Sequence, residues 1–208
     1  LYKLEKIVGE KNAAQSYLLC YQSVLDLKDI CKSLKADTGF ALKPSFQYAS
    51  FKKDVAGLKK EQICRKNIGI QTEWLDEKMM LDKFGIQRYG GLLSERGGQL
   101  DPYAFTHALL YTSIQKGLKV FDRTKVTDIE HPHKKVILTT EDKRKIQAKY
   151  LAIACGYESQ QYISKTVQHL HATYAIISEP LSATNLWYKN CLIWETQTPY
   201  LYCRTTKD

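Results

Sequence analysis

The stretch that most constrains the fold runs from Gly98 to Asp122, GQLDPYAFTHALLYTSIQKGLKVFD. Asp101 can cap a helix, and Pro102 suits the first helical position. A periodic run follows, Gly117 predicts its end, and LKVFD predicts a strand. This pattern is half of a strand-helix-strand unit of the kind that binds nucleotides. A glycine-rich phosphate loop should therefore accompany it.

The glycine pairs of GGLLSERGG do not supply that loop. They are Gly90-Gly91 and Gly97-Gly98. The stretch lacks the Lys-Ser/Thr of a P-loop and the spacing of a dinucleotide fingerprint. We therefore predict tight turns between strands at these glycines.

Hydrophobic periodicity predicts the remaining elements. Apolar residues at spacings near three and four predict one long amphipathic helix over residues 11–36. DVAGLKKEQICRKN predicts a second helix, and Asp76 can cap a short third one that stops at Gly85. The predicted strands are SFQYASF, QTEWL, KVTDIEH, KKVILTT, RKIQAKYLAIAC, ATYAIISEPL, CLIWE and PYLYCRT, with a hairpin tip at residues 141–143. Mixed helices and strands predict an α+β or α/β fold.

Charge and composition exclude several classes of protein. The chain has 208 residues and a net charge of +9, but its basic residues are spread through amphipathic segments. No basic arm, aromatic RNA-binding signature or zinc-finger spacing accompanies them, so we do not expect nucleic-acid binding. No apolar run approaches the roughly 18 residues that a membrane span needs, and LYKLEKIVGEK has no signal-peptide apolar region.

The six cysteines are irregularly spaced, no CxxC occurs, and several lie among apolar neighbours. We expect them to be free thiols in a reduced, cytoplasmic protein. The pairs His131/His133 and His169/His171 could each reach one metal ion. Neither pair has a carboxylate or Cys partner at ligand spacing, so surface histidines are preferred and no metal is expected.

The stretch PYLYCR contains the best candidate for a binding site. Strand alternation places Tyr200, Tyr202 and Arg204 on one face. A guanidinium beside aromatic walls suits a carboxylate held by two parallel hydrogen bonds. On the residues alone, a surface salt bridge explains Arg204 equally well.

Three runs resemble the D-amino-acid-oxidase-like family of FAD-dependent oxidoreductases, which includes glycine oxidase, sarcosine oxidase and D-amino-acid dehydrogenases. They are GGQLDPYAFTHALLYTSIQKGLKVF, TKVTDIE and VILTTEDKRKIQAKYLAIACGYES, in the family's order and spacing. The resemblance implies that the backbone of Val126 contacts the adenine of FAD. It also implies that Ala154, Cys155 and Gly156 form a turn near the cofactor. The family usually has Thr or Ser at the place of Cys155, so only the backbone role carries over.

The resemblance also extends to PYLYCRTTKD, which is similar to a substrate-domain strand of the family. It implies that Arg204 binds the substrate carboxylate and that Tyr202 and Tyr200 wall the pocket. The implied fold is a mixed-sheet substrate domain with helices plus a partial, Rossmann-like FAD-binding segment. Residues 1–94 would be the first part of the substrate domain, residues 95–160 the FAD-binding part, and residues 161–208 the returning substrate-domain strands.

The implied activity is oxidation of a small-molecule amine or amino acid to an imine, with hydride passing to FAD. The glycine-rich loop is then expected upstream of Leu1, and the last FAD-contacting glycines beyond Asp208. We therefore interpret the chain as a fragment that lacks bound FAD and is inactive alone. A non-catalytic binding or assembly domain of the same fold is the alternative, and a basic nucleic-acid-associated module is a weaker one.

Overall fold

The computed structural model describes residues 1–182 and 186–206. The chain forms two compact units, Leu1–Leu118 with Glu179–Asp208, and Lys119–Ser178. The boundaries expected at residues 94 and 160 separate substrate-domain parts from an FAD-binding part. They concern function rather than the compact units, so they stay predictions.

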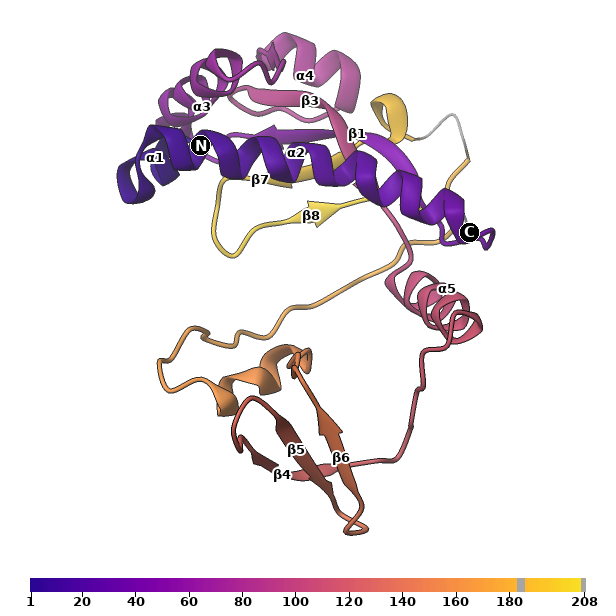
Figure 1. The fold of residues 1–208 in the computed structure, drawn as a ribbon. Coiled ribbons are helices and arrows are strands. Elements are labelled where there is room, and N and C mark those ends of the chain that lie inside the picture. The colour runs from indigo at the N-terminus through magenta and orange to yellow at the C-terminus, as the bar shows by residue number, and fades with distance from the viewer. Residues whose placement is uncertain (183–185, 207–208) are drawn as a thin grey trace. The chain divides into compact units, whose positions relative to one another are not determined.

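The first unit combines helices with a mixed sheet (Figure 1). Its helices are α1 (Tyr2–Val8), α2 (Glu10–Ser33), α3 (Val55–Asn67), α4 (Glu77–Phe84) and α5 (Pro102–Gln115). Its strands are β1 (Ala41–Tyr48), β2 (Glu73–Leu75), β3 (Gly91–Gln99), β7 (Leu192–Glu195) and β8 (Tyr202–Cys203). The helix expected over residues 11–36 is confirmed as α2, and the mixed fold class is confirmed.

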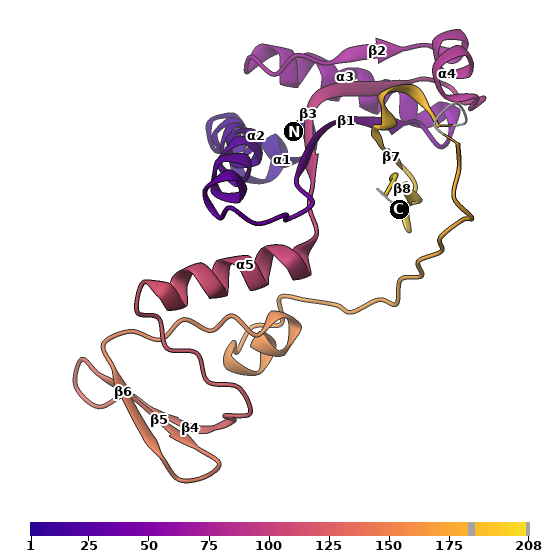
Figure 2. The ribbon, with the colours of Figure 1, turned by 90° about the vertical axis from the view of Figure 1, so that its right-hand side faces the viewer.

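The five strands of this sheet follow the order β2-β3-β1-β7-β8. β1 is antiparallel to β3 and parallel to β7, and β8 returns antiparallel to β7. The sheet therefore brings residues near 45 beside residues near 193. α2 runs beside β1 and β3 (Figures 1 and 2).

The two faces of this sheet are packed differently. One face carries the main apolar core, in which Phe46, Leu93 and Ile193 pack against residues of α4 such as Met80. The other face carries a smaller cluster around Leu58 of α3, which covers β2 and β3. Burial of these apolar side chains is the main force that holds the helices on the sheet.

Local signals set the helix ends as expected. The Asp76 carboxylate accepts a hydrogen bond from the Met79 N–H at 2.8 Å, and α4 ends at Gly85 with φ +66°. The Asp101 carboxylate accepts from the N–H groups of Tyr103 and Ala104 at the start of α5. Each cap satisfies donors that the first helical turn leaves unpaired.

The predicted turns at the glycine pairs are wrong, except that Gly90 precedes the strand with φ +121°. Gly91, Gly97 and Gly98 lie within β3. At Gly91 and Gly97 glycine is needed because the backbone of β1 approaches closely. A Cβ on Gly91 would lie 2.6 Å from the Gln47 carbonyl oxygen, and one on Gly97 would lie 2.7 Å from the Lys43 carbonyl oxygen.

The second unit holds a three-stranded antiparallel sheet of β4 (Val126–Glu130), β5 (Val136–Thr140) and β6 (Lys145–Ala148). The predicted hairpin tip is confirmed, since the Lys143 N–H donates to the Thr140 carbonyl. A 3-10 segment over Gly156–Tyr162 follows. Among the described residues, no helix is both long and apolar enough to cross a membrane.

Several predicted strands are wrong or too long. Residues 118–122 and residues 172–181 form no strand, and the strand predicted from residue 144 ends at Ala148. The strand predicted from residue 199 is reduced to β8. These runs have strand-like side chains, but a strand exists only where a second strand receives its backbone hydrogen bonds.

Candidate functional site

The candidate substrate residues lie at the β7–β8 edge of the five-stranded sheet. Trp194 of β7 pairs with Tyr202 of β8 across the antiparallel ladder, so their side chains share a face. The Trp194 ring meets the Tyr200 ring edge to face, with centroids 6.5 Å apart. The Trp194 indole N–H donates to Ser45 Oγ of β1 at 3.1 Å. An aromatic wall therefore spans β7 and the approach to β8.

Arg204 extends this wall beyond the end of β8. Of the three residues only Tyr202 lies in β8, and Tyr200 and Arg204 lie in irregular chain on either side of it. Burial raises the pKa of the Tyr202 hydroxyl, and the positive charge of Arg204 acts in the opposite direction. Tyr202 and Arg204 therefore lie close enough for the charge of Arg204 to act on Tyr202, and the shared face of all three side chains stays a prediction.

The β7–β8 part of this face is open. α3 reaches the same face over β3, where Arg65 donates to Ser94 Oγ at 3.4 Å. Tyr200 and Tyr202 are 62% and 48% exposed, and Arg204 is exposed as well. A small molecule can reach the guanidinium and the aromatic wall together.

Lys43 of β1 belongs to the same site and was missed by the sequence analysis. Its Nζ donates to Thr205 Oγ1 at 2.6 Å, next in the chain to Arg204. Burial lowers the pKa of Lys43 below its ordinary 10.5; the nearby Cys191 raises it, and the charge of Arg204 lowers it further. The spacing of Lys43 and Ser45 on β1 was a signal for a shared face, but nothing local linked β1 to residue 204.

The candidate cofactor residues lie in the second unit. Val126 begins β4 opposite Thr140 and is half-buried. Ala154, Cys155 and Gly156 are exposed, and Gly156 adopts φ +59°, a conformation that favours glycine. Residues 154 and 155 have no regular structure and Gly156 begins the 3-10 segment, so the turn near the cofactor stays a prediction.

The backbone beside this turn has free donors. In the described part of the chain, no hydrogen bond is formed by the N–H groups of residues 151–155. Main-chain N–H groups without a protein partner, followed by a glycine at positive φ, can donate hydrogen bonds to an anionic group such as a phosphate of FAD. The residues present thus fit a backbone contribution to FAD binding.

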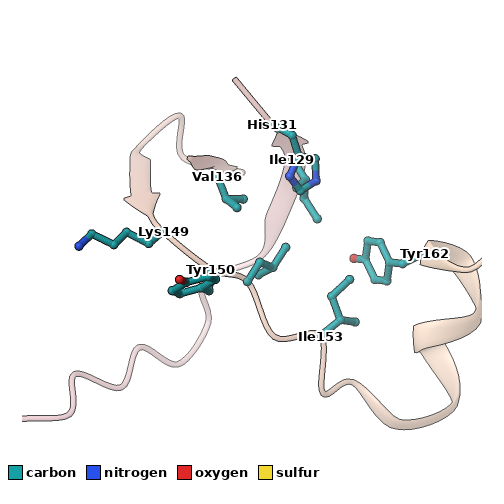
Figure 3. Close-up of a pocket in the computed structure, with 8 residues that line it drawn as sticks. Ile129, His131, Val136, Lys149, Tyr150, Ile153 and Tyr162 are labelled. Atoms are coloured by element: carbon teal, nitrogen blue, oxygen red, sulfur yellow. The ribbon is translucent and has the colours of Figure 1, made fainter. Parts of the chain in front are cut away.

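A pocket of about 520 Å³ lies elsewhere in the second unit (Figure 3). Figure 3 shows Tyr162 extending toward Ile129 and His131, while the Lys149 side chain points away. None of the candidate cofactor residues lines this pocket. His131 and His133 join no group of three potential metal ligands among the described residues.

Comparison with known proteins identifies related folds. The FAD dependent oxidoreductase (DAO) family matches the chain over residues 6–208. L-proline dehydrogenase from P. horikoshii superposes with a TM-score of 0.70 at 12% identity, over 89% of this chain and 51% of that one. Glycine oxidase from Geobacillus kaustophilus gives 0.55 at 18% identity, over 63% of this chain and 36% of that one. NikD, an unusual amino acid oxidase, gives 0.55 at 19% identity, over 65% and 36%.

No curated protein matches the chain. The structural likenesses concern the fold, because identity is 12% to 19%. The chain spans about a third to a half of the length of these solved structures.

Proposed function

Because this chain belongs to the FAD-dependent oxidoreductase family, we propose that the protein containing it oxidises an amino acid or related amine to an imine. The observation that carries this proposal is the exposed Arg204 beside the Tyr200–Tyr202–Trp194 wall. Proteins of similar fold named glycine oxidase, amino acid oxidase and L-proline dehydrogenase support an amino acid substrate.

Arg204 supplies the recognition step. Its planar guanidinium can donate two parallel hydrogen bonds to the substrate carboxylate. In the described part of the chain it forms no ion pair with an acidic side chain. Tyr202 and Tyr200 would flank the carbon skeleton and exclude water from one side.

The second unit would hold part of FAD. Val126 would contribute backbone contacts to the adenine, and Ala154, Cys155 and Gly156 would contribute the turn near the cofactor. When bound, FAD supplies the two-electron acceptor for the hydride that leaves the carbon bearing the amine, as the nitrogen lone pair closes the C=N bond. No general base in this chain is needed when the substrate amine is bound neutral.

The test is steady-state kinetics of the FAD-loaded protein that contains this chain. Arg204→Ala should lower kcat/KM for the amino acid by about tenfold to a few hundredfold, since a charge-assisted hydrogen bond contributes about 1.5 to 3 kcal/mol. Arg204→Lys should fall between, because it keeps the charge and loses the planar geometry. Most of the loss should appear in KM, because the carboxylate is held alike in the ground and transition states.

Two controls make the result specific. The matching amine without a carboxylate should be oxidised equally by the wild type and by Arg204→Ala. Arg123→Ala removes a guanidinium whose side chain is 94% exposed in the second unit and should change neither rate. Equal impairment of amino acid and amine, or of neither, would make Arg204 a structural residue.

A further inference from the structure

Two cations of different kinds, Lys43 and Arg204, lie near each other at the open β7–β8 edge. The Lys43 Nζ is held against Thr205 Oγ1 at 2.6 Å, so the ammonium lies beside the residue that follows Arg204. Burial is the main cause of the lowered pKa of Lys43, and the charge of Arg204 lowers it further. β1 supplies Lys43, and the segment after β8 supplies Arg204 and Thr205. The sheet itself creates this pairing, because β7 joins β1 to β8.

The described residues give this pair no counter-ion. Neither Lys43 nor Arg204 forms an ion pair with a carboxylate there. Cys191 also acts on Lys43, but burial raises the pKa of its thiol to about 12, so it is neutral near pH 7. Two nearby like charges repel each other, and a bound anion would remove that cost.

The two side chains suit two separate acid groups. A guanidinium presents a planar fork that matches one carboxylate, whereas an ammonium is a point charge that takes an oxygen from several directions. Lys43 has three N–H donors, and the contact with Thr205 uses one. A ligand with a single carboxylate at Arg204 would leave Lys43 without an anionic partner.

We propose that Lys43 and Arg204 together form a two-anion site and that the ligand carries a second acid group, as a dicarboxylic amino acid does. Arg204 holds the carboxylate beside the amine, and Lys43 holds the distal acid. The assignment of the carboxylate nearest the amine to Arg204 rests on the proposed function; the two-anion site itself does not.

Binding of unreactive acids tests the inference without turnover. The FAD-loaded protein that contains this chain is titrated by calorimetry with succinate and butyrate, and then with glutarate and pentanoate. Within each pair of equal carbon number, the dicarboxylate should bind at least about tenfold more tightly. Lys43→Met should abolish that preference and leave monocarboxylate binding within twofold of the wild type.

Further variants separate charge from folding. Lys43→Arg keeps the charge and should retain part of the preference. Thr205→Val frees the Lys43 ammonium from its hydroxyl partner and should reduce the preference severalfold. Lys52→Met removes an exposed lysine outside the site and should behave as the wild type.

Two outcomes overturn the inference: equal affinity for both members of each pair in the wild type, or equal loss for both in Lys43→Met. Failure of the proposed function is distinguishable from these. If no amino acid is oxidised but the preference is present and Lys43→Met abolishes it, the two-anion site stands and the oxidase proposal fails.

Discussion

At the scale of single residues, Gly91 shows why a position within a strand can require glycine: the neighbouring strand lies too close for a side chain. Gly91 opens β3 against both Gln47 and Phe46 of β1, where even a methyl group would collide. Phe46 is fully buried and stacks on Phe84 with ring centroids 4.4 Å apart. Its ring has little room to yield, and the Gln47 carbonyl belongs to the strand itself.

Gly91→Ala should therefore destabilise the protein by about 1 to 3 kcal/mol, the usual cost of overpacking a well-filled core. Glu95→Ala is the matched control, because it alters an exposed residue of the same strand and removes only a surface ion pair with Lys189, which contributes less than about 1 kcal/mol. Urea denaturation of the two variants measures the difference. Equal stability of Gly91→Ala and the wild type would mean that the sheet relaxes around the added methyl group.

At the scale of elements, Glu195 ties the β7–β8 connection to the rest of the sheet. Its carboxylate accepts hydrogen bonds from the Leu201 N–H at 2.9 Å and from Ser50 Oγ at 2.8 Å. Burial acts to raise the pKa of Glu195. The hydrogen bonds from Leu201, Ser50 and Tyr48, together with the positive charge of Arg88, lower it below its ordinary value of 4.5. The carboxylate therefore holds the chain just before β8 and so helps to place Arg204.

Glu195→Gln should destabilise the protein by about 1.5 to 3 kcal/mol at pH 7, the range for hydrogen bonds to a charged group. Because the folded pKa is depressed, the stabilisation by Glu195 is fully present above pH 4.5 and is lost as pH falls through the folded value. The difference between wild type and variant should therefore shrink as the pH falls below 4.5. Denaturation measured from pH 3 to 7 gives this profile.

Glu141→Gln is the control for this experiment. Its partner Lys125 lies at 3.5 Å on an exposed surface, so the variant should change stability by less than about 0.5 kcal/mol at any pH. A Glu195→Gln penalty that stays constant from pH 7 to pH 3 would show that its charge does not hold the connection.

The elements that the sequence predicts best are those set by neighbours in the chain. The caps at Asp76 and Asp101 are local, and both are observed. Lys43 could not be found in this way, because its place beside Arg204 depends on the pairing of β1 with β7.

Residues 172–181 are a case in which the local sequence predicts the wrong structure. Their apolar alternation predicts a strand, yet Ile176 is fully exposed and no strand forms. The sequence indicates which side chains suit a sheet, whereas a strand forms only where a second strand, often distant in the chain, pairs with its backbone.

At the scale of the whole molecule, the candidate roles are divided between the two units. Residues proposed to contact FAD lie in Lys119–Ser178, and those proposed to contact substrate lie in the unit that contains β8. The residues proposed for each role are only some of the groups that FAD binding and substrate binding require. The free N–H groups of residues 151–155 can contact a cofactor, but the 208 residues contain no GxGxxG sequence to bind a pyrophosphate at a helix N-terminus.

This division leads to a prediction about the 208-residue chain in isolation. It should be colourless and should bind FAD weakly or not at all, because the pyrophosphate carries the negative charge that a glycine-rich loop and helix N-terminus stabilise. Equilibrium dialysis with FAD measures this directly, and a longer chain that includes a GxGxxG motif provides the comparison. That longer chain should bind FAD stoichiometrically and absorb in the flavin band. If the isolated chain alone is yellow with one FAD per chain, the residues near 126 and 154–156 suffice, and FAD binding does not depend on a pyrophosphate loop.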